Sequence, residues 1–308
     1  MLNDGPIVGD MTDQRRLPRF GISLDPEAAR HSDALRLARA ADAGGLDYLA
    51  VQDHPYQPQH LDSWTWLTYL AGQTERIALL PDVADLQLRP PAMLAKAATT
   101  FDRLHSGRLA LGVGGGAFAD GIAAMGGTRR TNADMVTYTE EALRILRPAL
   151  AGDVVHLNGR QHRVEGYHAG PAPASPISVW LGGQGPRMLA VTGRLADGWI
   201  SPLNIYVPPA EVPAKQHIID ESARSAGRDP RQIRRIYNVI GTIGRGGGPG
   251  LSGSVELWAD TLADWSARLG FDTFIFWPAV APHTQLDLFV HNVIPAVRDR
   301  LHTEVTAP

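Results

Sequence analysis

Short apolar runs alternate along this chain with segments in which apolar residues recur at helical spacing. Arg19–Ser23 reads as a strand, and the segment after it places Ala34, Leu35, Ala38 and Ala41 on one helical face. Further strands are predicted from apolar runs of the same kind, at residues 46–51, 76–83, 108–116, 177–183, 197–201, 235–243 and 272–278. Most of these runs precede a helical segment, so the chain repeats a β/α unit.

The repeated unit predicts an α/β fold, a (β/α)8 TIM barrel. Its strands are continuous apolar runs, as expected for parallel strands buried on both faces. No glycine-rich dinucleotide fingerprint with a following acidic residue favours an open sheet instead. The long interval between Gly116 and Ile177 contains a helix (about 132–150) and a hairpin signal at Asn158–Gly159, which predict an insertion, helix plus hairpin, after the fourth strand. Residues 1–18 are expected to form a flexible tail, and residues 19–308 a single domain.

Composition narrows the class of partner. The net charge of −3 is that of neither a nucleic-acid-binding nor a membrane-surface protein, and no segment has the length and apolarity of a membrane span. The chain has no cysteine, which fits a reducing cytoplasm and excludes thiolate chemistry. We therefore expect a cytoplasmic protein whose partners are neither nucleic acids nor membranes.

Barrels of this type build their active sites at the carboxyl ends of the strands. Asp53, His54 and Asp82 are the polar residues there that could ligate a metal, too few for a metal-dependent hydrolase, so no metal is expected. Two ends are instead rich in glycine, at 112–116 and 181–186. Glycines let backbone N–H groups approach an anion, and a following helix N-terminus favours negative charge, so the pair favours phosphate binding over simple tight turns.

Two longer motifs carry a resemblance to a known family. The segments "LRPPAMLAKAATTFDRLHSGR" and "GPRMLAVTGRLADGW" resemble the luciferase-like monooxygenase superfamily of flavin- and F420-dependent oxidoreductases, closest to its actinobacterial F420-type branch. The resemblance implies hydride transfer between coenzyme F420 and a small organic substrate, by a protein that is often a homodimer. Two alternatives stay open: an FMN-dependent monooxygenase with a partner reductase, and a non-catalytic cofactor carrier.

The resemblance also implies roles for particular residues. It places a cis peptide that supports the cofactor ring at Asp82–Val83, where Asp replaces the usual small residue. Asp53 and His54 map beside the reactive atom of the ring. His54 would exchange the proton that accompanies hydride transfer, and Asp53 would bond a ring nitrogen or orient His54. The alternative is a purely structural role, in which Asp53 caps a helix or turn and His54 packs over it. The phosphate and ring contacts map to Gly114, Gly115, Gly182, Gly183 and Gln184.

The choice between F420 and FMN depends on the tail of the cofactor. F420 continues beyond its phosphate into an anionic oligoglutamate tail, whereas FMN ends at the phosphate. Arg129 and Arg130 follow the fourth strand, and Arg187 follows the second glycine-rich turn. Positive charge is therefore available near both glycine-rich strand ends. The sequence therefore favours F420.

Overall fold

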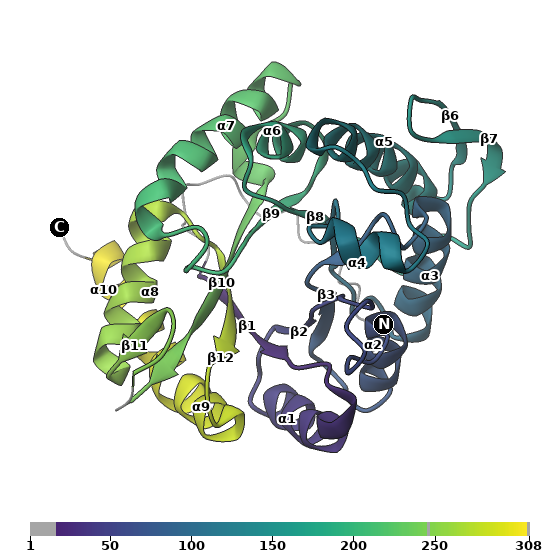
Figure 1. Ribbon diagram of the computed structural model, residues 1–308. Helices are drawn as coiled ribbons and strands as arrows, with labels where there is room; N and C mark the ends of the chain where they lie inside the picture. Colours follow the sequence, from purple (N-terminus) through teal and green to yellow (C-terminus); the bar gives the residue numbers. More distant parts are fainter. Residues whose placement is uncertain (1–16, 245–246, 307–308) are drawn as a thin grey trace, which may run out of the picture.

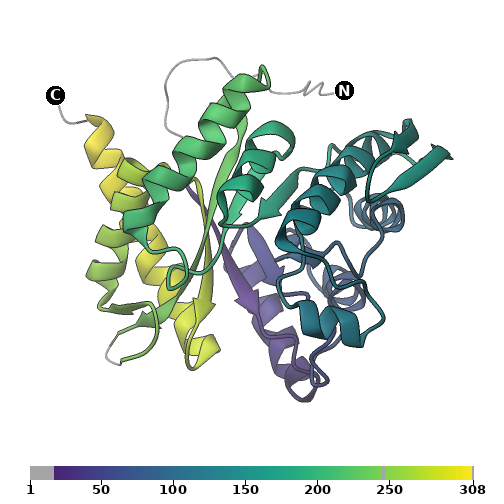
Figure 2. The same cartoon turned by 45° about the horizontal axis from the view of Figure 1, so that its top comes forward.

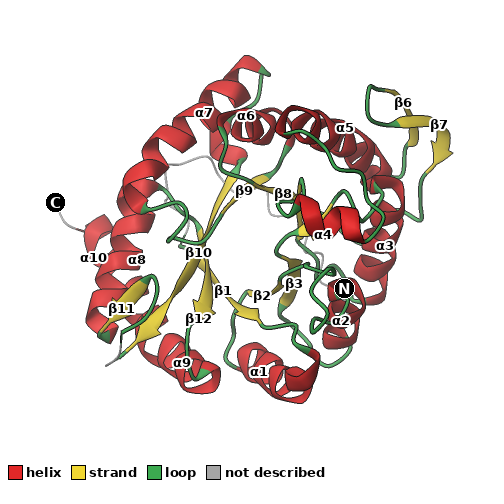
Figure 3. Ribbon diagram, viewed as in Figure 1, coloured by secondary structure: helices red, strands yellow, loops and turns green. Residues whose placement is uncertain are grey.

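The protein forms a barrel of parallel strands inside a ring of helices (Figures 1 and 3). The computed structural model describes residues 17–244 and 247–306. The predicted flexible tail therefore lies almost entirely outside the described residues. In the described ranges, no helix is both long enough and apolar enough to cross a membrane.

Each predicted strand overlaps a strand of the barrel, and the fold class is confirmed. The barrel strands in the described part of the chain are β1 (Arg19–Leu24), β2 (Tyr48–Val51), β3 (Ala78–Pro81), β4 (Ala84–Asp85), β5 (Leu111–Gly114), β8 (Val179–Gly182), β9 (Gly198–Ser201), β10 (Arg234–Ile243) and β12 (Thr273–Pro278). They pair in chain order, with β1 between β2 and β12. A short strand, β11 (Leu251–Gly253), pairs with the end of β10 outside this path.

The third strand of the barrel is interrupted and forms two strands, β3 and β4. The first and last strands of the sheet meet there, so the barrel closes at this point. At its lower end, the Leu79 amide donates to the Arg108 carbonyl, and the Ala110 amide donates to the Leu79 carbonyl. At its upper end, β4 pairs with β5 instead. The peptide between β3 and β4, Asp82–Val83, is cis. The cis peptide predicted at this position is therefore confirmed.

The helices of the ring follow the strands and begin or end at residues suited to those positions. Ser254 caps α8 by accepting the Leu257 amide, and Gly270 ends it with a φ of +70°. The helices are α1 (His31–Ala43), α2 (Ser63–Ala71), α3 (Pro91–Leu104), α5 (Asn132–Ala151), α6 (Pro186–Leu195), α7 (Val212–Ser225), α8 (Val255–Leu269), α9 (Pro282–Leu288) and α10 (Ile294–Thr306). A π-helical turn, Phe289–Val293, joins the last two.

The interval between β5 and β8 contains more than one helix. Helix α5 lies in the outer ring between α3 and α6 (Figure 1). Helix α4 (Ala119–Ala124) and the antiparallel hairpin of β6 (Val154–Asn158) and β7 (Arg163–His168) are additional to the barrel pattern. The hairpin extends beyond the ring (Figure 2). The helix expected as part of an insertion thus takes the place of a barrel helix.

The inside of the barrel is packed rather than hollow. Leu80, Ile200, Ile236 and Ile275 meet in an apolar cluster on the barrel axis. Trp180 reaches Tyr48 there, with an edge-to-face contact of 5.2 Å between ring centroids. In barrels of this type the ligand site lies beyond such a cluster, at the carboxyl ends of the strands.

Candidate active site

The cis peptide and the two glycine-rich strand ends meet at one place. A Cβ at Gly114 would lie 2.6 Å from Cγ2 of Val83, and a Cβ at Gly182 would lie 3.1 Å from its Cγ1. Val83 therefore occupies the space that side chains at these two glycines would fill. The structure brings together three residues that the sequence placed in the cofactor site.

The next glycine of each turn permits a close helix approach. A Cβ at Gly115 would meet Oγ1 of Thr139 at 2.8 Å, and one at Gly183 would meet Cγ of Met188 at 2.6 Å. Thr139 belongs to α5 and Met188 to α6. The two helices begin side by side, and the Arg187 side chain at the start of α6 donates to the Ala133 carbonyl at the start of α5, at 3.4 Å. Both interpretations of the glycines thus have support: they are required for packing, and the packing gathers two helix N-termini beside the turns.

The start of α6 suits an anion. Its N-cap, Gly185, supplies no side-chain hydrogen bond, and Pro186 occupies the first turn. Amides of that turn are consequently left without a side-chain cap, and the helix dipole adds partial positive charge. Gln184, predicted to contact the cofactor, is exposed just before this helix, and its carbonyl accepts a hydrogen bond from Lys215 at 3.3 Å.

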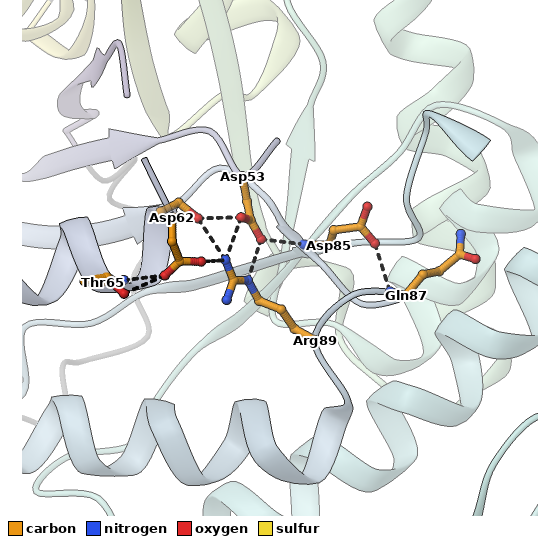
Figure 4. A network of polar contacts seen from close by, with 7 residues as sticks. Asp53, Asp62, Thr65, Asp85, Gln87 and Arg89 are labelled. Atoms are coloured by element: carbon orange, nitrogen blue, oxygen red, sulfur yellow. Dashed lines mark hydrogen bonds and ion pairs between the residues drawn. The ribbon is translucent and has the colours of Figure 1, made fainter. Parts of the chain in front are cut away.

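Asp53, at the end of β2, is buried in a polar network (Figure 4). Arg89 donates to both of its oxygens, from Nε at 2.7 Å and from Nη2 at 2.8 Å. The Ser63 hydroxyl donates to Oδ1 at 2.6 Å, and the Asp85 amide donates to Oδ2 at 3.0 Å. Both oxygens are thus engaged within the protein. This placement favours a positioning role for Asp53 over the predicted contact with a ring nitrogen.

The network joins β2 to the backbone that follows the cis peptide. Asp85 belongs to β4, two residues after Val83, and Asp62 caps α2 by accepting the Thr65 amide at 2.8 Å. Burial opposes the charge of Arg89, but hydrogen bonds and the charges of Asp53 and Asp62 raise its pKa. Burial likewise opposes ionisation of Asp62, yet Arg89 lowers its pKa. The ionised network therefore holds the strand ends in fixed register.

His54 lies at the exposed rim of the site. Its ring stacks on Tyr56 at 5.5 Å, and Tyr56 meets Phe118, at the start of α4, at 5.2 Å. Desolvation and the neighbouring His60 lower the pKa of His54, while Asp53 opposes this effect. His54 is consequently a neutral base near pH 7, bordered by aromatic rings that suit an organic substrate.

Gln87 connects the second half of the network to the first glycine turn. Its Nε2 donates to the Gly115 carbonyl at 2.6 Å, and its Oε1 accepts from Arg130 at 2.8 Å. Arg130 also lies over the Tyr138 ring, 3.9 Å from its centroid. Arg129 instead pairs with Asp120 at the surface. The predicted basic pair is thus divided, and Arg130 is the member beside the glycine turn.

Two buried carboxyl groups near the cis peptide have unusual pKa values. Burial raises the pKa of Asp82 to about 7, against a hydrogen bond from Asn238. Burial also raises the pKa of Asp85 to about 6, with the Gln87 amide opposing and the charge of Asp53 adding to the rise. Perturbed carboxyl groups in one place are typical of a functional site. In residues 17–244 and 247–306, no three His, Asp or Glu side chains are grouped so that they could hold a metal ion.

Comparison with known proteins now identifies the family. The model of the luciferase-like monooxygenase family matches residues 17–245. The chain belongs to this family. It is 27% identical over 233 residues to an F420-dependent glucose-6-phosphate dehydrogenase of Gordonia bronchialis, covering 72% of this chain and 67% of the relative. It is 31% identical over 219 residues to a 5,10-methylenetetrahydromethanopterin reductase of Methanolobus tindarius, covering 70% of this chain and 62% of the relative.

A solved structure confirms the fold of this luciferase-like protein. An F420-dependent secondary alcohol dehydrogenase, solved with an F420–acetone adduct, matches with a TM-score of 0.81 and 19% identity, over 92% of this chain and 100% of the other. At that identity the likeness concerns the barrel, not the substrate.

The residues at the barrel mouth fit a planar cofactor that carries a phosphate. The glycine strand ends around Val83 leave backbone rather than side chains at the mouth, and α6 offers uncapped amides. Buried polar atoms without a partner among the described residues also occur at strand ends, including Oδ2 of Asp82 and Oγ of Ser23. Such atoms are typical of sites that a polar ligand completes.

Sequence reasoning missed Arg89, Gln87 and Asn238. Asn238 had a signal, since it interrupts the apolar run of β10 at a position buried inside the barrel. Arg89 stands directly before Pro90–Pro91 at the start of α3, within a motif that carried the resemblance, but no local pattern indicates its partner.

Proposed function

We propose that this protein is an F420-dependent oxidoreductase that transfers a hydride between the deazaflavin and a small organic substrate. The observation that carries the proposal is the pair of relatives over about 70% of the chain, one of them named for F420 itself. The barrel mouth supports the same proposal, because its glycine turns, helix N-termini and arginines suit a ring with an anionic tail.

Residues at the ends of three barrel strands would hold the cofactor. Val83, with Gly114 and Gly182 against it, would support the ring. Gly115 and Gly183 would bring backbone amides toward the phosphate, together with Gln184 and the first turn of α6. Arg130 and Arg187, which flank these turns, would attract the tail. When bound, F420 supplies a ring carbon that accepts or gives up a hydride.

The protein's own contribution to the reaction is proton exchange and positioning. His54, held neutral by desolvation, would accept the proton of a substrate that loses a hydride, and would return it in the reverse direction. Tyr56 and Phe118 would exclude water from the substrate side. Asp53 would act through Arg89 by fixing the strand end that carries His54. A homodimer and a cytoplasmic location stay predictions.

The cofactor that the protein retains tests this proposal. The protein should be produced in a host that makes both F420 and FMN, and the small molecules released on denaturation should be weighed by mass spectrometry. We expect F420 to be recovered with the protein. Recovery of stoichiometric FMN without F420 would contradict the proposal and favour the FMN-dependent monooxygenase. To separate an enzyme from a carrier, the reduced F420 complex is offered a panel of carbonyl compounds and its reoxidation is followed.

A further inference from the structure

The carboxyl group of Asp82 lies on the floor of the barrel mouth. Asp82 continues the inward-facing row of β3 one step above Leu80, which belongs to the apolar cluster on the barrel axis. Its partner Asn238 stands one step above Ile236 of the same cluster. Asp82 is only 8% exposed. The group is thus held between an apolar floor and the space that a ligand would enter.

The hydrogen bonds around Asp82 have a fixed direction. The indole N–H of Trp277 can only donate, and it donates to Oδ1 of Asn238 at 3.1 Å. The amide nitrogen of Asn238 therefore faces Asp82 and donates to its Oδ1 at 3.3 Å. Oδ2 of Asp82 has no partner among the described residues. One oxygen accepts, and the other is left for something that the chain does not provide.

Among residues 17–244 and 247–306, no cation compensates a charge at this position. Asn238 and Trp277, which approach from β10 and β12, are neutral. Arg89, on the loop that follows the cis peptide, is bonded to Asp53 and Asp62. An ionised, half-satisfied carboxylate in such surroundings is strongly disfavoured, whereas a protonated carboxyl is tolerated. The neutral form also carries the one hydrogen that Oδ2 can donate.

We propose that Asp82 is a cofactor-contacting residue that works as a neutral carboxylic acid, donating a hydrogen bond from Oδ2 to an acceptor atom, a carbonyl oxygen or an imine nitrogen, of the bound heteroaromatic ring. The inference rests on the proposed function, because it places the ring at this mouth. It assigns a role to the Asp side chain where the family resemblance implies only a small residue. Burial, which raises the pKa of Asp82 to about 7, supplies the neutral form at and below that pH.

Two variants separate donation from packing. Asp82→Asn keeps an acceptor for Asn238 and replaces the O–H with an N–H donor that cannot titrate, whereas Asp82→Ala removes both. Binding of F420 is measured by fluorescence titration between pH 5.5 and 8.5. At pH 6 we expect Asp82→Asn to bind within about twofold of wild type, and Asp82→Ala to bind roughly fivefold more weakly. From pH 6 to 8.5, wild type should lose about tenfold in affinity relative to Asp82→Asn, because the carboxylate cannot donate.

Any titration of the cofactor itself affects both proteins equally, so it cancels in the ratio of the wild-type affinity to the Asp82→Asn affinity at each pH. Equal pH profiles for the two proteins, or equal affinity for Asp82→Ala at pH 6, would overturn the inference. If wild type binds FMN and not F420, the proposed function fails, and the same comparison with FMN decides the role of Asp82. Binding of neither would overturn both.

A second readout needs no cofactor. Infrared difference spectra of the ligand-free protein, wild type minus Asp82→Asn, should contain the carbonyl band of a protonated acid at pH 6 and lose it by pH 8.5. Asp85 contributes equally to both proteins and cancels. Absence of the band at pH 6 would overturn the inference even if binding changed, and thermal unfolding of both variants shows whether they are folded.

Discussion

Arg89 binds Asp53 through two hydrogen bonds, one from Nε and one from Nη2, to the two oxygens of a carboxylate that is fully buried. Thirty-six residues separate them in the sequence. The pair joins the segment after β2, which contains His54, to the segment after the cis peptide, so it fixes these two parts of the barrel mouth relative to each other.

Loss of Asp53 should destabilise the protein. Asp53→Ala leaves Arg89, with a side chain 19% exposed, facing a vacated site, and removal of one partner of a buried pair costs about 3 kcal/mol of unfolding free energy. Asp264→Ala, which breaks an exposed pair on α8, should cost about 0.5 kcal/mol or less. Urea unfolding measures both. Equal, small losses would show that the Arg89–Asp53 pair does not hold the strand ends together.

Removal of the His54 imidazole should affect turnover and spare binding. We expect His54→Ala to reduce the rate of hydride transfer about 100-fold, as loss of general acid–base catalysis does, with cofactor affinity within about twofold of wild type. His217→Ala, an exposed histidine of α7, is the matched control. Single-turnover kinetics with reduced F420 separate the two effects, and an unchanged rate would return His54 to a packing role at the rim.

A methyl group at Gly114 should disturb the support of the ring. The new Cβ would lie 2.6 Å from Cγ2 of Val83, so the side chain of Val83 must shift. Gly114→Ala should therefore weaken F420 binding about tenfold and lower stability by about 1–3 kcal/mol. Gly72→Ala, where the nearest atom would be 3.5 Å away, should change neither. Unchanged affinity in a destabilised Gly114→Ala would place the ring elsewhere.

The two neighbouring arginines should differ in their effect on the anionic tail. Arg130 is held beside Gly115 through Gln87, whereas Arg129 pairs with Asp120 and is 63% exposed. We expect Arg130→Ala to weaken F420 binding about fivefold and to reduce its dependence on salt, with little effect from Arg129→Ala. Titrations at several ionic strengths measure both, and identical salt slopes in the two variants would remove Arg130 from the tail site.

The elements of the fold were predictable because their signals are local. Apolar runs marked every barrel strand except the two-residue β4, and they put Asp53 after β2 and Gly182 at the end of β8. The cis peptide at Asp82–Val83 came from the family resemblance, since no periodicity encodes it.

The pairing of polar groups was not predictable. Nothing near Asp53 indicates that Arg89 saturates its carboxylate, or that Asn238 faces Asp82 across 156 residues. Such partners depend on strand register and side-chain direction inside the closed barrel, which the sequence pattern does not contain. Residue type thus indicated which polar side chains follow the strands, but not which of them are engaged by other side chains of the protein.

The central claim, that the barrel mouth binds F420, is tested most directly by parallel titration of the ligand-free protein with F420 and with FMN. We predict saturable binding of F420 that is tighter than that of FMN and that weakens with added salt, because part of the attraction is between exposed charges. Micromolar binding of FMN with no detectable binding of F420 would contradict the account and assign the barrel to FMN chemistry.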